Sequence, residues 1–159
     1  TLEVFGLSAY AEVPPAVLGF GLRRKVTVAA VFAMRPRILV LDEPTNGLDR
    51  RSTDELMARV LGLHYEGHTV LLITHDMRLV ADNAPWTVVL HEGRVLAQGP
   101  TREVLARSGP MQTAHIAPPQ ITRLARRLAP HGMPSDVLTV GEFCTAYERA
   151  VEARRGSAV

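Results

Sequence analysis

The sequence contains very little lysine. Lys25 is the only lysine among 18 basic residues, and all the others are arginines. A phosphate-binding loop of the Gly-Lys-Ser/Thr type needs a lysine followed by a hydroxyl residue, because that lysine reaches the terminal phosphates of a nucleotide. Lys25 stands between Arg24 and Val26. The 159 residues therefore contain no complete loop of this type.

Cysteine, long apolar runs and net charge are also scarce. Cys144 is the only cysteine, so no disulfide can form within the chain, which is typical of a reducing compartment. The most apolar stretch, residues 26–34, is about half of a membrane-spanning helix, and no secretory signal is visible. The formal net charge is +2 and the arginines are not gathered in blocks, which argues against a nucleic-acid partner.

The first half of the chain alternates helical patterns with apolar runs. Residues 38–41 form a continuous apolar run, and residues 69–74, TVLLIT, hold a second one between two threonines; both segments predict strands buried on both faces of a parallel sheet. A helix is predicted over residues 22–34, before the first strand. A second helix is predicted over residues 50–64, with Asp49 as its N-cap.

The second half has weaker but distinct signals. A Glu-Gly pair at residues 92–93 between two short apolar runs indicates a β-hairpin, and residues 139–142 form a capping box for a last helix. We predict an α/β fold with a mostly parallel sheet, to which the hairpin adds an antiparallel edge. This fold is expected over residues 1–110, and a small helical extension over residues 111–159.

The most informative segment is residues 38–49, which read ILVLDEPTNGLD. Its adjacent carboxylates, Asp42 and Glu43, follow a strand of the predicted parallel sheet, at the end where α/β folds bind ligands. Neighbouring side chains at a strand end point in different directions. One carboxylate can then serve a metal while the other orients or deprotonates a water, two tasks that phosphoryl transfer keeps separate. An Asp-Glu pair alone is more often an ordinary polar strand end, but the whole segment through Asp49 favours a catalytic site.

This segment resembles the Walker B motif and D-loop of ABC-type ATPases. Residues 73–76, ITHD, resemble the H-loop of that family, and residues 18–26, LGFGLRRKV, stand where the family has its signature. The order of signature, helix, Walker B, D-loop, helix, strand and H-loop is that of the family. The resemblance implies the C-terminal part of a P-loop NTPase domain that uses ATP and Mg²⁺.

The resemblance also implies a role for each residue. Asp42 is implied as the Mg²⁺-site carboxylate, acting through water, and Glu43 as the general base that polarises the attacking water. His75 is implied as the sensor of the γ-phosphate, and Asp49 as the D-loop aspartate that reaches across a dimer interface. The signature residues are implied to meet the γ-phosphate held by the opposing subunit, with backbone N–H groups at a helix N-terminus; they are Leu18, Gly19, Phe20 and Gly21.

The signature departs from the family's Leu-Ser-Gly-Gly-Gln. Gly19 replaces the serine and removes a hydroxyl donor, while Phe20 replaces the first glycine. Leu22 stands at the Gln or Glu position. We expect the bulky ring of Phe20 to point out of the loop.

The C-terminal part is similar to importer-type ATPases, and in particular to energy-coupling-factor ATPases. The similar segments are residues 89–101, 118–125 and 137–143. In that group paired ATPases grip a transmembrane coupling subunit that works with a substrate-binding membrane subunit, and they drive the uptake of vitamins or of cobalt or nickel ions. The resemblance thus implies a homo- or heterodimer of ATPase subunits on the inner, cytoplasmic face of the cell membrane.

The family's P-loop, its aromatic stack for adenine and its Q-loop are absent from these residues, so we expect a fragment that hydrolyses no ATP alone. Two alternatives stay open. One is a non-catalytic partner chain that lends its signature and D-loop to a complete ABC subunit, and the other is a non-transport ABC ATPase. The transported substrate cannot be read from the sequence, because ABC ATPases do not contact it.

Overall fold

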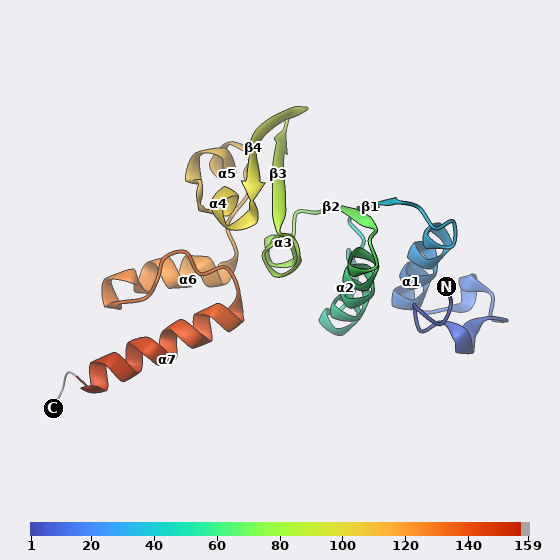
Figure 1. Ribbon diagram of the computed structural model, residues 1–159, viewed down its shortest axis with the longest axis horizontal. Helices are drawn as coiled ribbons and strands as arrows, with labels where there is room; N and C mark the ends of the chain where they lie inside the picture. Colours follow the sequence, from blue (N-terminus) through green and yellow to red (C-terminus); the bar gives the residue numbers. More distant parts are fainter. Residues whose placement is uncertain (157–159) are drawn as a thin grey trace. The chain divides into compact units, whose positions relative to one another are not determined.

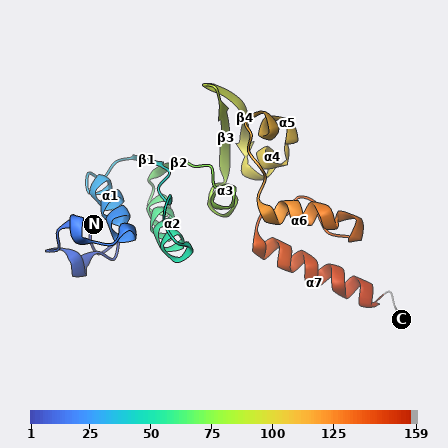
Figure 2. The same cartoon turned by 180° about the vertical axis from the view of Figure 1, so that it is seen from behind.

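A computed structural model describes residues 1–156 of the chain (Figures 1 and 2). The chain divides into two compact units, the first from Thr1 to Thr74 and the second beginning at His75. The predicted domains, residues 1–110 and 111–159, stay a prediction. Within the described residues, no helix is both long enough and apolar enough to span a membrane.

The first unit pairs two parallel strands with two long helices. Its elements are η1 (Ser8–Tyr10), η2 (Pro15–Val17), α1 (Phe20–Phe32), β1 (Ile38–Asp42), α2 (Arg50–Tyr65) and β2 (Thr69–Ile73). The strands pair in parallel, with Ile38 opposite Thr69 and Asp42 opposite Ile73. Parallel neighbours need a crossover connection, which α2 provides. The predicted α/β fold with a parallel sheet is confirmed in this unit.

Helix α2 begins where the sequence predicts. Asp49 has an extended backbone and its carboxylate accepts the N–H of Ser52 at 2.7 Å, so it caps the helix. Leu56, Val60 and Leu63 are at most 1% exposed and recur at helical spacing. This apolar stripe supplies much of the unit's core.

The prediction that the strands are buried on both faces is wrong for this chain. Leu39 and Leu41 are buried, whereas Ile38 and Val40, which point to the opposite face, are 62% and 54% exposed. A strand is buried on both faces only where elements cover both sides of its sheet. Helices α1 and α2 lie on the same side of the β1–β2 pair (Figure 1), so no helix of this unit covers the other face.

The second unit is built on a hairpin and a set of shorter helices. Its elements are α3 (Met77–Asn83), β3 (Trp86–His91), β4 (Arg94–Pro100), α4 (Thr101–Ala106), α5 (Ser108–Thr113), α6 (Gln120–Leu128), η3 (Ala129–His131) and α7 (Val140–Gly156). Strands β3 and β4 are antiparallel and joined at Glu92 and Gly93, both with positive φ. The predicted hairpin is confirmed.

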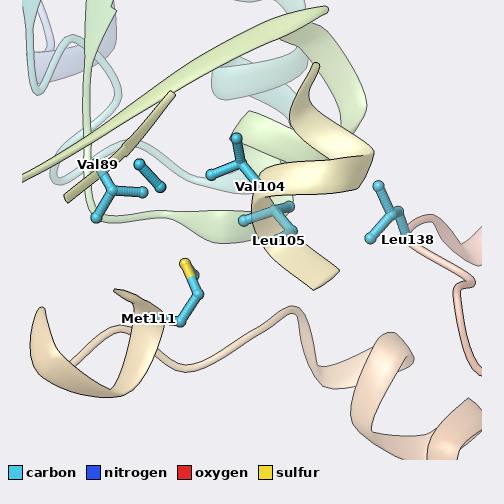
Figure 3. Packing of buried hydrophobic residues seen from close by; sticks show 6 residues of the cluster. Val89, Val104, Leu105, Met111 and Leu138 are labelled. Atoms are coloured by element: carbon cyan, nitrogen blue, oxygen red, sulfur yellow. The ribbon is translucent and has the colours of Figure 1, made fainter. Parts of the chain in front are cut away.

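The hairpin has an apolar core of its own within the second unit. Among the described strands, β3 and β4 pair only with each other. The buried face of the hairpin packs on short helices of its own unit: Val89 of β3 joins Val104 and Leu105 of α4 and Met111 of α5 in one cluster (Figure 3). The hairpin therefore buries its apolar face against helices α4 and α5.

The capping box predicted at residues 139–142 opens α7. The Thr139 hydroxyl accepts the N–H of Glu142 at 3.2 Å, and the Glu142 carboxylate accepts the N–H of Leu138 at 2.8 Å. The guanidinium of Arg102 also donates to Glu142. Partial burial acts to raise the pKa of Glu142, but the Leu138 N–H and Arg102 outweigh it and hold this pKa below its usual range.

Candidate functional site

Two carboxylates lie at the carboxyl end of β1 in different surroundings. Asp42 ends the strand and is exposed, whereas Glu43 is half-buried. The N–H of Glu43 donates to the carbonyl of Ile73 at 2.9 Å, and its carboxylate accepts the hydroxyl of Thr74 at 3.2 Å. Glu43 is thus held by the end of the neighbouring strand. One carboxylate open to solvent and one held in place suit the two separate tasks expected of this pair.

Arg24 of α1 reaches the same strand end. Its Nε donates to the carbonyl of Pro44 at 2.8 Å, and its Nη2 lies 3.3 Å from the carbonyl of Asp42 and also donates to that of Glu43. Sequence reasoning did not single out Arg24, because nothing in the sequence distinguishes it from its neighbour Arg23. The side chain of Arg23 turns instead to the Ala16 carbonyl at 3.4 Å.

The signature segment forms the N-terminus of α1. Leu18 is buried and Gly19 is the N-cap with no capping side chain, while Phe20 is 52% exposed. The N-terminus of α1 therefore lacks a side-chain cap, because Gly19 has no hydroxyl. A serine or threonine at this position could accept an N–H of the first helical turn. The structure presents this turn at the surface, beside the strand end that carries Glu43.

Phe20 points outward, as expected, but its ring also packs on the D-loop. A Cβ atom built at Gly47 would come 3.0 Å from Cε1 and 3.2 Å from Cζ of the ring, and Gly47 has φ +76°. One helical position on, a Cβ at Gly21 would come 3.3 Å from the hydroxyl of Ser52. The signature segment and the start of α2 are therefore in direct contact.

Asp49 and His75 lie in different units. Asp49 is exposed, and hydrogen bonds from the backbone and then the side chain of Ser52 lower its pKa. His75 is exposed and follows Thr74 directly in the chain, as the first residue of the second unit. Asp76 caps α3, because its carboxylate accepts the N–H groups of Arg78 and Leu79, the second and third residues of that helix. The structure thus gathers the signature, strand-end and D-loop residues in one unit, and His75 starts the other.

Comparison with known proteins agrees with these motifs. A protein-family model described as "AAA domain, putative AbiEii toxin, Type IV TA system" matches residues 5–81. The energy-coupling factor transporter ATP-binding protein EcfA2 of Streptococcus agalactiae is 39% identical over 136 residues, which cover 84% of this chain and 49% of that protein. EcfA2 of Streptococcus pyogenes is 36% identical over 129 residues, covering 81% and 46%.

A solved structure supports the same assignment. The cbiO1 protein from Clostridium perfringens, part of the ABC transporter complex cbiONQ, matches with a TM-score of 0.63 and 32% identity, over 81% of this chain and 47% of that one. The chain belongs to the ABC-type ATPases. It spans about half the length of the curated relatives it matches.

The single lysine of this ABC-type chain is engaged in an ion pair. Nζ of Lys25 lies 2.6 Å from Oε2 of Glu55, and Arg51 binds the other carboxylate oxygen at 3.0 Å. The hydrogen bond from Lys25 is the largest of the effects that lower the pKa of Glu55. Lys25 therefore joins α1 to α2, and this ion pair gives the lysine a structural role that needs no bound phosphate.

The residues of this ABC-type site fit Mg²⁺ only as part of a phosphate complex. Among the described residues, no group of three or more His, Cys, Asp or Glu side chains could hold a metal ion. Mg²⁺ is usually bound through one or two carboxylates together with substrate phosphates. The single exposed carboxylate of Asp42 suits that mode of binding.

Proposed function

We propose that this chain is part of the ATP-binding and ATP-hydrolysing subunit of an ABC importer of the energy-coupling-factor type. The observation that carries the proposal is the strand end of β1, where Glu43 is held by Thr74 at 3.2 Å beside the exposed Asp42. The relatives named energy-coupling factor transporter ATP-binding proteins support the choice of importer type. The importer would take up a metal ion or a vitamin.

In this proposal the two carboxylates share the work of hydrolysis. Glu43 orients the attacking water and accepts its proton, a role that a half-buried carboxylate fixed by a hydroxyl donor is suited to. Asp42 would hold Mg²⁺ through water, and Mg²⁺ bound there supplies positive charge next to the phosphate oxygens. Thr74 keeps the Glu43 carboxylate in one orientation.

The other site residues act at the γ-phosphate and across a dimer. The first turn of α1 at Gly19, Phe20 and Gly21 offers N–H groups and a helix N-terminus to the γ-phosphate of the opposing subunit, because its positive end favours an anion. Leu18 anchors this turn in the core. His75 senses the γ-phosphate, and Asp49 reaches across the interface while it caps α2.

The proposed partners follow from the same assignment. They are a second ABC ATPase subunit, a transmembrane coupling subunit and a substrate-binding membrane subunit. One relative is itself described as part of the complex cbiONQ. The assembly would lie on the inner face of the cytoplasmic membrane, with this chain as a peripheral component.

The test is expression of the protein as its gene encodes it, together with the membrane proteins encoded beside it. We expect a membrane subunit to co-purify with it and the assembly to hydrolyse ATP. The 159 residues alone should show no turnover, because they hold no Gly-Lys-Ser/Thr loop. ATP hydrolysis without any membrane partner would favour a non-transport ABC ATPase, and co-purification without hydrolysis would favour a non-catalytic partner chain.

A further inference from the structure

Arg24 donates to three successive backbone carbonyls that bracket Glu43. Its guanidinium contacts the carbonyls of Asp42, Glu43 and Pro44, with 2.8 Å to Pro44 and 3.3 Å to Asp42. We infer that Arg24 is a positioning residue, which fixes the backbone of the strand end so that the Glu43 carboxylate keeps one orientation. This inference rests on the proposed function of Glu43 as the general base.

The backbone at Glu43 needs such support. Glu43 has φ +42°, in the left-handed region that residues with a side chain rarely adopt. A residue stays there only where its surroundings hold it. The N–H of Glu43 is bound by the Ile73 carbonyl at 2.9 Å, and its carbonyl accepts the N–H of Asn46 at 3.2 Å as well as Arg24. Both peptide groups of Glu43 are thus fixed, and with them the direction of its side chain.

An arginine is suited to this task and a lysine is not. The guanidinium is planar and carries five N–H donors in a rigid fork, so Nε and Nη2 can bind carbonyls two residues apart at once. The ammonium of a lysine is a single point that cannot span them. Arg24 is also half-buried, where its hydrogen bonds to carbonyls are stronger than in water.

Other contacts of α1 keep Arg24 in register with the strand end. Phe20, one turn before Arg24, lies against Gly47, and Lys25 binds Glu55 at 2.6 Å. Helix α1 is therefore tied to the D-loop, to the strand end and to α2 along a short stretch. The guanidinium reaches the three carbonyls from a helix that is itself held in place.

The first test measures ATP hydrolysis by the protein as its gene encodes it, in three variants. For Arg24→Ala we expect kcat to fall by about 10- to 100-fold, as for a displaced catalytic group, while KM for ATP stays within about twofold. Arg24→Lys should recover little of kcat, because the fork is lost. Arg23→Ala, the matched control on the same helix, should leave both constants unchanged.

The second test follows amide hydrogen exchange in the protein as its gene encodes it, without nucleotide. Arg24→Ala should speed exchange at the amides of Glu43 and Asn46, and leave the amides in the middle of α2 unchanged. Unaltered exchange at both amides overturns the inference, and faster exchange throughout the first unit shows a role in folding only and also overturns it. A wild-type protein that binds and hydrolyses no ATP overturns the proposed function, and with it the catalytic meaning of Arg24, whatever the exchange shows.

Discussion

The ring of Phe20 lies against the backbone of Gly47, so that a Cβ atom at residue 47 would stand only 3.0 Å from the ring carbon Cε1. This contact joins the first residue of α1 to the loop between β1 and α2. A glycine is required at residue 47 for two reasons, because its φ is +76° and because the ring fills the space of a side chain.

Gly47→Ala should destabilise the first unit more than Gly67→Ala does. Both glycines have positive φ, and alanine in this region costs about 1–2 kcal/mol. Only at residue 47 must the Phe20 ring also move, since nothing lies within 4 Å of a Cβ at Gly67. Urea unfolding followed by far-UV circular dichroism measures both costs.

The Phe20→Ala background separates the two effects at residue 47. There the cost of Gly47→Ala should fall to that of Gly67→Ala, because only the backbone strain remains. Equal costs for the two alanine variants in the wild-type background would show that the ring contact contributes nothing.

Thr101→Val should destabilise the second unit by about 1–3 kcal/mol, the cost of buried polar groups that lose their partner. The Thr101 hydroxyl is buried and bonds the Ala84 carbonyl at 2.5 Å and the Thr87 hydroxyl at 2.7 Å. Valine keeps the shape and removes both bonds. Trp86, the single tryptophan, begins β3 in the same unit, so its fluorescence during urea unfolding reports this change.

The matched control for this substitution is Thr113→Val. The hydroxyl of Thr113 is exposed and bonds only the Gly109 carbonyl of its own helix at 3.1 Å. Its replacement should change the free energy of unfolding by no more than about 0.5 kcal/mol. A similar loss of unfolding free energy in both variants would contradict the claim that the two buried hydrogen bonds of Thr101 stabilise the second unit.

Acid should weaken the second unit through Glu142. The Leu138 N–H and Arg102 outweigh partial burial and lower the pKa of Glu142 in the folded chain. A carboxyl with a lowered folded pKa stabilises the fold above its unfolded pKa, about 4.3 for glutamate. This stabilisation is lost as the pH falls through the folded pKa. Urea unfolding of the wild type, monitored by Trp86 fluorescence, should show this loss between neutral pH and pH values below about 4.

Glu142→Gln is the informative variant for the acid effect. Glutamine can still accept the N–H of Leu138, but it carries no charge for Arg102. Its unfolding free energy should be lower at neutral pH and should depend less on pH than that of the wild type. Glu148→Gln, on the exposed side of the same helix, should keep the wild-type pH dependence. An unchanged pH profile in Glu142→Gln would contradict this assignment.

The elements that could be predicted from sequence are those with local signals. The start of α2 follows from the Asp49 cap and the helical spacing of apolar residues such as Leu56, Met57 and Val60, and the hairpin from its Glu-Gly turn. The capping box of α7 is predicted from the order of Thr139 and Glu142; the bond from the Glu142 N–H to Thr139 is present, while the Glu142 carboxylate binds the N–H of Leu138, one residue before the cap. Each of these depends on residues close together in the chain.

What could not be predicted depends on contacts between distant residues. The open face of β1 at Ile38 and Val40 depends on which elements cover the sheet, and an apolar run does not specify this. The bonds of Arg24 to carbonyls about twenty residues away have no sequence signal, because Arg23 beside it looks the same. The left-handed backbone of Glu43 is likewise held by hydrogen bonds with Ile73, Arg24 and Asn46. Ile73 and Arg24 are distant in the chain, and Ile73 and Asn46 contribute only backbone groups, which side-chain identity does not reveal.

The most direct test of the account is the rate of ATP hydrolysis by the encoded protein with Glu43→Gln. Glutamine has nearly the same shape but cannot accept the proton of the attacking water, so kcat should fall by about 10²- to 10⁴-fold while ATP still binds. The exposed control Glu66→Gln should hydrolyse ATP at the wild-type rate. Full activity in Glu43→Gln would contradict the claim that this carboxylate at the end of β1 is the general base.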